Sequence, residues 1–410
     1  MKSLGPAFNR MWGASLLTNL ADGVLSAAAP LLAVSLTKNP VLISALSALV
    51  MLPWLLFAIP IGAIVDRVDR RFLLAGANAM RFLIAALLAL AISTHTITIY
   101  LLFVATFLIG VCEVTADTTS QSLIPQILNK SQYESGNSKL QISETVIQGF
   151  VGTPLSGILY AVAIYLPFAA NSLGFLIAAG LAASIPVKFL QDMRSDEKSQ
   201  EKPDFLAEMK FGITYLYNDK TLLRLVVTTA SIGLCYSMAT STIILFILHQ
   251  MHLAPSLFGV ALAVQGLGAI VGGLLAPKLS SRFGRSKVMA ISIFMSSFTV
   301  LLEGFSPNIY IFIALASVGS FTISNWNILL MATYQDVIPT DLFGRIHGTR
   351  RTIVWGLMPF GSLLGGFIAK GGLRLPLFVG GAIATFISLL SLSFFMNVGD
   401  LSAKKSASND

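Results

Sequence analysis

Residues 51–93 read MLPWLLFAIPIGAIVDRVDRRFLLAGANAMRFLIAALLALAIS, and this stretch decides the fold class. Two apolar runs flank the charged segment Asp66–Arg71, and each run approaches the ~20 residues that a helix needs to cross a bilayer. The stretch therefore predicts two transmembrane helices that are joined by a short polar loop.

The rest of the chain repeats this pattern of long apolar runs and short loops. Of the 410 residues, 55% are hydrophobic and only 11% are charged, whereas a soluble domain carries about 25% charged residues. We therefore predict an all-α integral membrane protein of twelve transmembrane helices with no room for a separate soluble domain. The predicted spans are 10–36, 42–64, 72–93, 98–119, 141–164, 167–187, 221–249, 255–278, 288–305, 308–333, 347–370 and 374–396.

The cationic side chains are divided unevenly between the two sides of the predicted membrane. The termini and the loops after even-numbered spans hold nearly all of them, and the opposite side holds only Lys38, Lys370 and Arg374. Because cytoplasmic loops carry such an excess, we predict a multi-pass protein of the cell (inner) membrane with both termini in the cytoplasm. The net charge of +8 then needs no nucleic-acid partner.

The longest loop divides the spans into two groups of six. Within it, apolar residues recur at helical spacing and predict an amphipathic helix on the cytoplasmic interface: Phe205, Met209, Ile213 and Leu216. The predicted domains are a bundle at 1–187, a linker at 188–220, a second bundle at 221–396 and a cytoplasmic tail at 397–410.

The two groups of six are also related in sequence. Asp66–Arg71 follows the second span, and the degenerate copy Ser281–Ser286 follows the eighth. The fifth and eleventh spans each carry a proline amid small residues, Pro154 and Pro359. Two pseudo-symmetric six-helix bundles with a site between them near the bilayer midplane are a transporter architecture.

Ionisable residues inside a membrane are expensive, so each is a candidate functional residue. Asp22 lies deepest, roughly 18 Å into the first span at 1.5 Å per residue. It shares a helix face with Ser15, Asn19 and Ser26. Such a carboxylate is suited to couple proton or substrate binding, and the alternative is an acid that serves packing or gating through hydrogen bonds within the helix.

Further charges lie in the third and fourth spans. Glu113 and Asp117 are one turn apart near the cytoplasmic end of the fourth span. Arg81, in the third span, is placed to pair with Glu113. The simplest interpretation of that pair is a structural ion pair.

The fifth and ninth predicted spans each contain one acidic residue. Gln141, Glu144 and Gln148 form a polar stripe near the cytoplasmic end of the fifth span. Glu144 is suited to attract a cationic substrate or carry a proton, and a gate salt bridge is the alternative. Glu303 lies near the outer end of the ninth span, where we expect it to be solvated.

At the loop between the second and third spans, the sequence resembles a known family. Gly62–Arg71, GAIVDRVDRR, is similar to the signature G-x-x-x-D-R-x-G-R-R/K of the major facilitator superfamily, with Asp69 in place of one glycine. The resemblance implies that the loop aspartate caps the eleventh helix and that the arginines form a charge network with an acid of the fourth. The implied cytoplasmic gate comprises Gly62, Asp66, Arg67, Arg70, Arg71 and Asp117, with Arg350 and Arg351 as further gate or interface cations.

A second resemblance lies in the fifth span. Gly149–Gly157, GFVGTPLSG, is similar to the antiporter motif G-x-x-x-G-P-x-x-G. Gly149, Pro154 and Gly157 match it, and Thr153 replaces a glycine. In the family the motif marks exporters, in which small residues let the fifth and eighth helices pack closely.

Other stretches resemble one bacterial branch of the superfamily, the transmembrane secretion effectors, which contains macrolide and siderophore exporters. They are Pro30–Ala33, Leu52–Trp54 and Glu113–Gln121, and the resemblance covers roughly the whole chain. In the family the fifth and tenth helices line the central cavity. This makes Asn325 and Trp326 candidates for substrate contact, with Asn327 beside them, and helix packing is the alternative.

Together these features predict a secondary active transporter that exports a small amphipathic molecule, drug-like or a secondary metabolite, by proton antiport and alternating access. The predicted partners are the substrate, protons and the lipid bilayer, and we expect a monomer. Uptake, a lipid-like substrate, or a non-transporting sensor on the same scaffold are the alternatives. The sequence has no Walker motif, metal-ligand spacing or nucleophile–base pair that stands out, so we predict no enzyme, metal or cofactor.

Overall fold

The computed structural model describes residues 4–65, 67–129, 132, 136, 139–140, 143–186, 205–338 and 342–398. Every regular element in these ranges is a helix. Two predicted site residues, Asp66 and Gln141, lie outside the described residues, as do most of the linker before residue 205 and the tail after residue 398.

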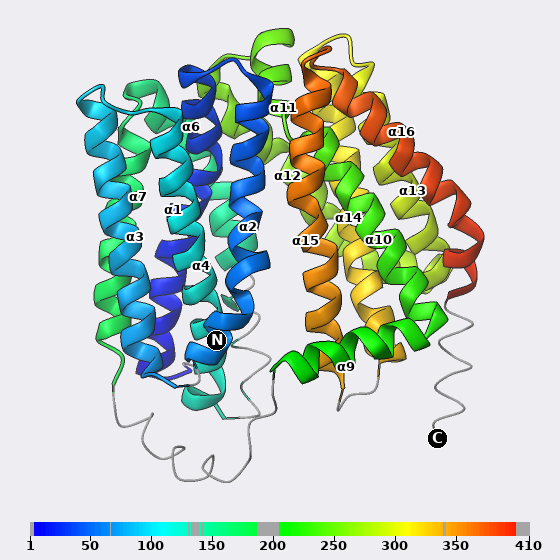
Figure 1. Cartoon of the computed structure of the whole chain (residues 1–410), viewed down its shortest axis with the longest axis horizontal. Coiled ribbons are helices and arrows are strands. Elements are labelled where there is room, and N and C mark those ends of the chain that lie inside the picture. The colour runs from blue at the N-terminus through cyan, green and yellow to red at the C-terminus, as the bar shows by residue number, and fades with distance from the viewer. Residues whose placement is uncertain are drawn as a thin grey trace. The chain divides into compact units, whose positions relative to one another are not determined.

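The helices follow the predicted spans closely (Figure 1). In the first half they are α1 (Pro6–Leu36), α2 (Pro40–Val65), α3 (Arg70–Ser93), α4 (Ile99–Ile127), the π-helix η2 (Ser143–Gly152), α6 (Thr153–Val162) and α7 (Leu166–Ala183). In the second half they are α9 (Phe205–Asn218), α10 (Lys220–Thr240), α11 (Ile243–Leu245), η4 (Phe246–Gln250), η5 (Pro255–Leu257), α12 (Phe258–Phe283), α13 (Arg285–Gly304), α14 (Ile309–Val337), α15 (Phe343–Ala369) and α16 (Leu375–Leu390).

Ten helices in the described residues are long and apolar enough to cross a membrane, and the bent pair Leu375–Leu390 and Leu392–Val398 makes up to eleven. This confirms a multi-pass helical membrane protein. At the fifth predicted span, the apolar helix Val146–Val162 is shorter than the others. The count of twelve therefore stays a prediction.

Side-chain caps explain where several helices begin. Asp69 accepts a hydrogen bond from the backbone N–H of Arg71, and Asp219 accepts one from Thr221. Thr98 and Asn308 cap α4 and α14 in the same way. Each cap satisfies one of the N–H groups that the first turn of a helix leaves free, so short polar segments are enough to end one span and start the next.

The chain forms two compact units. Unit 1 comprises Met1–Lys38, Leu49–Glu201 and Ala254–Ala263, and unit 2 comprises Asn39–Ala48, Lys202–Leu253 and Val264–Asp410. In unit 1, α1 packs against α7, η2 and α6, and α3 packs against α4 and α7. In unit 2, α10 packs against α15 and α16, and α13 packs against α14 and α16. Counted by predicted span, each of these neighbour pairs of unit 1 has its equivalent six spans later, as an internal repeat requires.

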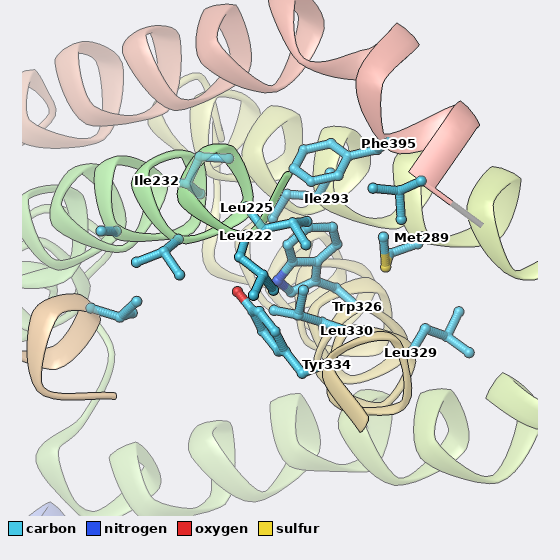
Figure 2. Packing of buried hydrophobic residues seen from close by; sticks show 14 of the residues in the cluster. Leu222, Leu225, Ile232, Met289, Ile293, Trp326, Leu329, Leu330, Tyr334 and Phe395 are labelled. Carbon is cyan, nitrogen blue, oxygen red and sulfur yellow. The ribbon is translucent and has the colours of Figure 1, made fainter. Parts of the chain in front are cut away.

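A large apolar core fills unit 2. Trp326, 1% exposed, lies among Leu222, Leu225 and Met289, and its ring meets that of Phe395 edge to face at 4.9 Å between centroids (Figure 2). In a bilayer, side chains packed in this way stabilise a helix bundle through van der Waals contact rather than through removal of apolar surface from water. The core therefore holds α10, α13 and α14 together as one body.

The helix α9 packs on the ends of α10 and α15 (Figure 1). Leu216 is buried, and Gly212 lies against the side chain of Thr349, whereas Phe211 and Tyr217 are exposed. The amphipathic helix expected in the 188–220 segment is therefore present from Phe205 to Asn218, with one face on unit 2.

Candidate functional site

The central feature of unit 1 is a buried ion pair between α1 and α3. The guanidinium of Arg81 donates a hydrogen bond to the carboxylate of Asp22. Arg81 is 1% exposed and the Asp22 side chain is 14% exposed. Removal of two charges from water is costly, so such a pair persists only where each charge has the other as its partner.

Aromatic and polar groups of α7 complete the surroundings of this ion pair. The Arg81 guanidinium lies 4.0 Å from the ring centroid of Phe175, which is fully buried. Asn171 donates to the backbone carbonyl of Ala21 at 2.5 Å, next to Asp22. The Nε of Arg81 has no hydrogen-bond partner among the described residues. Groups of α7 therefore hold the ion pair on one side, while the Nε of Arg81 makes no hydrogen bond to the described residues.

The expected partner of Arg81 was wrong. The sequence places Arg81 beside Glu113, but the ion pair forms with Asp22. The reason is the packing of α3: spacing along one helix gives the direction of a side chain, whereas its partner depends on which neighbouring helix lies opposite. Asp22 is therefore a charge-paired acid rather than an isolated one.

Glu113 lies in the same electrostatic neighbourhood. It interacts with Asp22, Arg81, Asp117 and Glu144, so α1, α3, α4 and η2 all contribute a charged group. Glu113 is partly buried, whereas Asp117 and Glu144 are exposed. Of these four carboxyl groups, that of Asp22 forms the salt bridge with Arg81. We call these five residues, Asp22, Arg81, Glu113, Asp117 and Glu144, the acidic cluster.

Other predicted residues of α1 and η2 flank the acidic cluster. The Asn19 amide donates to the carbonyl and hydroxyl of Ser15, one turn earlier in α1. The backbone carbonyl of Gln148 lies against Gly23, and a Cβ built on Gly152 would lie 2.7 Å from the Cα of Gly23. The polar face of α1 is thus next to η2, with glycine backbone in direct contact beside Asp22.

Near the end of the π-helix η2, the carbonyl group of Gly149 has a side-chain donor. In a π-helix the carbonyl of residue i accepts from the N–H of residue i+5, and the partner of Gly149 would be Pro154, which has no N–H. The hydroxyl of Thr153 donates to this carbonyl instead. The threonine that departs from the glycine motif therefore supplies the hydrogen bond that the proline removes.

The glycine motif of residues 149–157 makes a close contact with a neighbouring helix in unit 1. A Cβ on Gly157 would meet the carbonyl oxygen of Ser256 at 2.5 Å, and Gly259 lies against the carbonyl of Thr153 and the Cα of Pro154. Gly149 has open space beside it. The motif thus places backbone against backbone where α6 meets η5 and the start of α12, the contact that small residues allow.

The described residues of the predicted gate in unit 1 lie mainly near the end of α2, in the loop after it and at the start of α3. Arg70 donates to the carbonyl of Ser122 at 3.4 Å and Arg71 to that of Ile185 at 3.3 Å. Gly62 lies in α2 with open space beside it, and Arg67 is exposed. The arginines thus connect the loop after α2 to the ends of α4 and α7, and Asp69, the residue that departs from the signature, caps α3.

The two predicted gate cations of unit 2 stack on aromatic rings. The guanidinium of Arg350 lies 4.3 Å from the Tyr334 ring centroid, and that of Arg351 lies 4.4 Å from the ring of Trp355. Both arginines are near the start of α15. Cation–π contacts of this kind hold a guanidinium in place without neutralising its charge.

The expected contact of Asn325 and Trp326 with substrate is not supported. Asn325 is fully buried and its amide donates to Phe321 at 2.9 Å, and Trp326 belongs to the core of unit 2. Both therefore match the packing alternative. Their neighbour Asn327 is the exposed polar residue of this stretch. Residues one position apart point about 100° apart on a helix, so a polar triplet cannot by itself reveal its accessible member.

Two buried charges were missed by sequence reasoning. Glu303, expected to be solvated, is 5% exposed, and Lys139, assigned to a loop, is 8% exposed. The Lys139 ammonium lies 4.9 Å from the Trp12 ring, and Trp12 donates to Ser143 at 2.9 Å. An apolar stretch around Glu303 was the available sign that its side chain lies within a bundle.

Many apolar spans with charged residues buried at helix contacts define a multi-pass membrane transporter. Comparisons with known proteins identify its family. The family model described as transmembrane secretion effector matches residues 4–410. The chain belongs to this family of the major facilitator superfamily, whose members are transporters rather than enzymes.

Relatives and solved structures agree with this assignment. Macrolide efflux protein A of Streptococcus pyogenes is 20% identical over 88% of this chain and 89% of its own length. Multidrug resistance protein 2 of Bacillus subtilis is 25% identical over 35% of this chain and 36% of its length. A bacterial homologue of the iron transporter ferroportin, in an inward-facing state, shares the fold with a TM-score of 0.75 and 14% identity, covering 96% of this chain and all of the other. The nucleoside transporter NupG gives 0.70 and 12%, covering 96% and 99%.

Proposed function

We propose that this transporter exports a small amphipathic molecule with a basic group, in exchange for protons, by alternating access. The observation that carries the proposal is the acidic cluster. It brings carboxyl groups of α1, α4 and η2 into one electrostatic neighbourhood beside a buried arginine, and carboxyl groups are suited to bind either a proton or a protonated amine. The names of the relatives, which refer to macrolide and multidrug efflux, agree with a substrate of this kind.

The Asp22–Arg81 pair is a suitable coupling element. When Asp22 is ionised, its attraction to Arg81 holds α1 against α3. A proton on Asp22 removes that attraction, and the two conformations of the transporter then differ in stability by the lost interaction. Coupling requires only that protonation and substrate binding favour different conformations.

Inverted membrane vesicles with an acidic interior test this function. Erythromycin, other basic antibiotics and siderophores are added to the outside, and proton efflux is followed with a pH-sensitive dye. Asp22→Asn and Glu144→Gln run beside the wild type. Asp336→Asn is the matched control, because Asp336 is an exposed acid of unit 2 that pairs with Arg285.

We expect a compound of the panel to release protons from wild-type and Asp336→Asn vesicles and to release few or none from Asp22→Asn. Accumulation of the compound without proton movement would contradict antiport and would indicate facilitated export instead. Movement of the compound out of the vesicles would indicate uptake as the physiological direction.

A further inference from the structure

Glu303, 5% exposed, is the most deeply buried acidic residue in the described part of the chain, and the acidic cluster does not include it. It belongs to the last turn of α13 in unit 2. Its carboxyl oxygen approaches Gly319 of α14, beside the hydroxyl of Thr299 one turn earlier in α13. The side chain therefore lies between two packed helices and reaches back along α13.

The cation at the end of α13, Arg374, forms no salt bridge with this carboxyl group. Arg374 donates to the backbone carbonyls of Gly304 at 2.9 Å and of Ser306 at 3.1 Å, and its guanidinium lies 5.6 Å from the Phe246 ring centroid. Its donors are thus directed at the end of α13 rather than at the adjacent acid. Among the described residues, no salt bridge or hydrogen bond to the Glu303 carboxyl group is present.

The other elements around Glu303 add one titratable group. Tyr236 of α10 interacts electrostatically with Glu303. Thr299 of α13 uses its hydroxyl to donate to Ser296 in its own helix, and α16 contributes Arg374 at its N-terminal end. Tyr236 is 42% exposed, so this neighbour of Glu303 reaches the accessible surface of unit 2.

Burial without a cation or hydrogen-bond donors disfavours the ionised form of a carboxyl group relative to the protonated form. We propose that Glu303 is a second proton-binding residue, located in unit 2 and separate from the acidic cluster of unit 1. It binds a proton while α10, α13 and α14 enclose it, and it releases the proton when their rearrangement during transport admits water. Only this release step rests on the proposed antiport function.

Carbodiimide labelling tests proton binding without any transport measurement. Dicyclohexylcarbodiimide enters apolar sites and adds to a protonated carboxyl group: the carboxyl oxygen bonds to the central carbon, the proton moves to a nitrogen, and rearrangement gives a stable N-acylurea. The purified full chain is labelled in detergent at a series of pH values, and the modified residue is located by mass spectrometry after proteolysis. Asp336 serves as the internal control, because it is an exposed, ion-paired acid.

At pH 7 we expect labelling of Glu303 to exceed that of Asp336 by about tenfold or more, because Glu303 is buried in apolar surroundings that the reagent enters, whereas Asp336 is exposed and ion-paired. Labelling should fall as the pH rises, and the Glu303→Gln variant should lose that peptide's modification. Labelling of Glu303 no greater than that of Asp336, or labelling that does not change with pH, would overturn the proposal. The decisive comparison, between Glu303 and Asp336, is made in the wild-type protein. A folding defect of the variant therefore does not affect it.

Release during transport is tested in the vesicles described above. Glu303→Gln should make compound-driven proton efflux less dependent on pH, and Glu303→Asp should restore the dependence in part, as a purely structural role would not. An unchanged pH profile in Glu303→Gln would overturn the release step. If the wild type moves no protons, antiport fails, and the labelling experiment still decides whether Glu303 binds a proton.

Discussion

The Asp22–Arg81 pair is the residue-scale feature with the largest expected energetic effect. Arg81 is almost fully enclosed by α1, α3 and α7, so water cannot replace a lost partner. Loss of one member of a buried pair costs about 3–5 kcal/mol, because the other charge is left without compensation. An exposed pair contributes about 0–1 kcal/mol. The chain contains both kinds, which allows a direct comparison.

We predict that Arg81→Leu lowers the free energy of unfolding by about 3 kcal/mol, whereas Arg285→Leu, which breaks the exposed pair with Asp336, lowers it by less than about 1 kcal/mol. Thermal unfolding in detergent, followed with a thiol-reactive dye, measures both, because Cys235 is buried and Cys112 is partly buried in the folded protein. Addition of Asp22→Asn to Arg81→Leu should recover part of the loss. Equal shifts for the two single variants would show that Arg81 does not depend on Asp22.

Thr153 gives a second residue-scale prediction. Thr153→Val keeps the shape of the side chain but removes the hydroxyl that satisfies the carbonyl of Gly149. We expect a loss of about 1–3 kcal/mol, the cost of a buried acceptor without a donor. Thr153→Ser retains the hydroxyl and should stay close to the wild type in the same thermal assay. If valine were tolerated as well as serine, the hydrogen bond would have no role in holding η2.

The candidate site could be predicted only in part from the sequence. Spacing along α1 and η2 identified Asp22, Asn19 and Glu144 as polar residues within apolar spans. It could not identify the partner of Arg81 or the burial of Trp326, because both depend on contacts between helices distant in the sequence. Glu303 was missed for the same reason: its position near a helix end suggests water, and only the packing of α14 encloses it.

At the scale of elements, the apolar pattern predicted where the helices lie better than where they end. The fourth span was expected to end at residue 119 and the tenth at residue 333, but α4 continues to Ile127 and α14 to Val337. Hydropathy reports the part of a helix that matches the thickness of the hydrocarbon, whereas the backbone hydrogen bonds continue into the polar ends. Polar caps such as Thr98 and Asn308 were better markers of helix starts.

The π-helix could not be predicted from periodicity. The sequence indicated a single α-helix over 141–164, and the structure divides the described part into η2 and α6 at Thr153. Pro154 was visible as an irregularity, but whether a proline kinks a helix or changes its hydrogen-bonding pattern depends on the groups around it. Here Gly23 and Gly152 let α1 approach closely enough to hold the wider turn.

The cap of α3 supports an element-scale prediction. Asp69→Ala removes the acceptor for the Arg71 N–H and should lower the free energy of unfolding by about 1 kcal/mol. Asp69→Gly, which restores the residue of the family signature, should cost only a few tenths of a kcal/mol, because glycine is itself tolerated at this position. The thermal assay compares the two. A larger loss for glycine than for alanine would exclude capping as the function of Asp69.

At the scale of the whole molecule, large apolar side chains cover much of the accessible surface. Leu87 is 65% exposed, Val162 is 73% exposed and Leu274 is 75% exposed. Soluble monomers rarely expose so many large apolar residues together, and a bilayer covers such surfaces. The neighbour pairs that recur six spans apart add the internal repeat that the related loops at 66–71 and 281–286 indicate.

The orientation of the chain in the membrane gives the whole-molecule prediction. A cysteine at Thr96, exposed between α3 and α4, should react with a membrane-impermeant maleimide in intact spheroplasts. A cysteine at Ser281, exposed at the end of α12, should react only after the membrane is permeabilised. The wild type, with its two cysteines in membrane-spanning helices, is the background control. The reverse pattern would place the termini outside the cell.

The contact between Gly23 and Gly152 has a mechanical consequence. Most neighbouring helices are separated by side chains that can change rotamer and absorb a small displacement. Here the backbone of α1 touches the backbone of η2 beside Asp22, so no side chain lies between them to absorb a displacement. If α1 shifts when Asp22 gains or loses its proton, η2 must shift with it, and Glu144, eight residues before Gly152, is displaced in the same step.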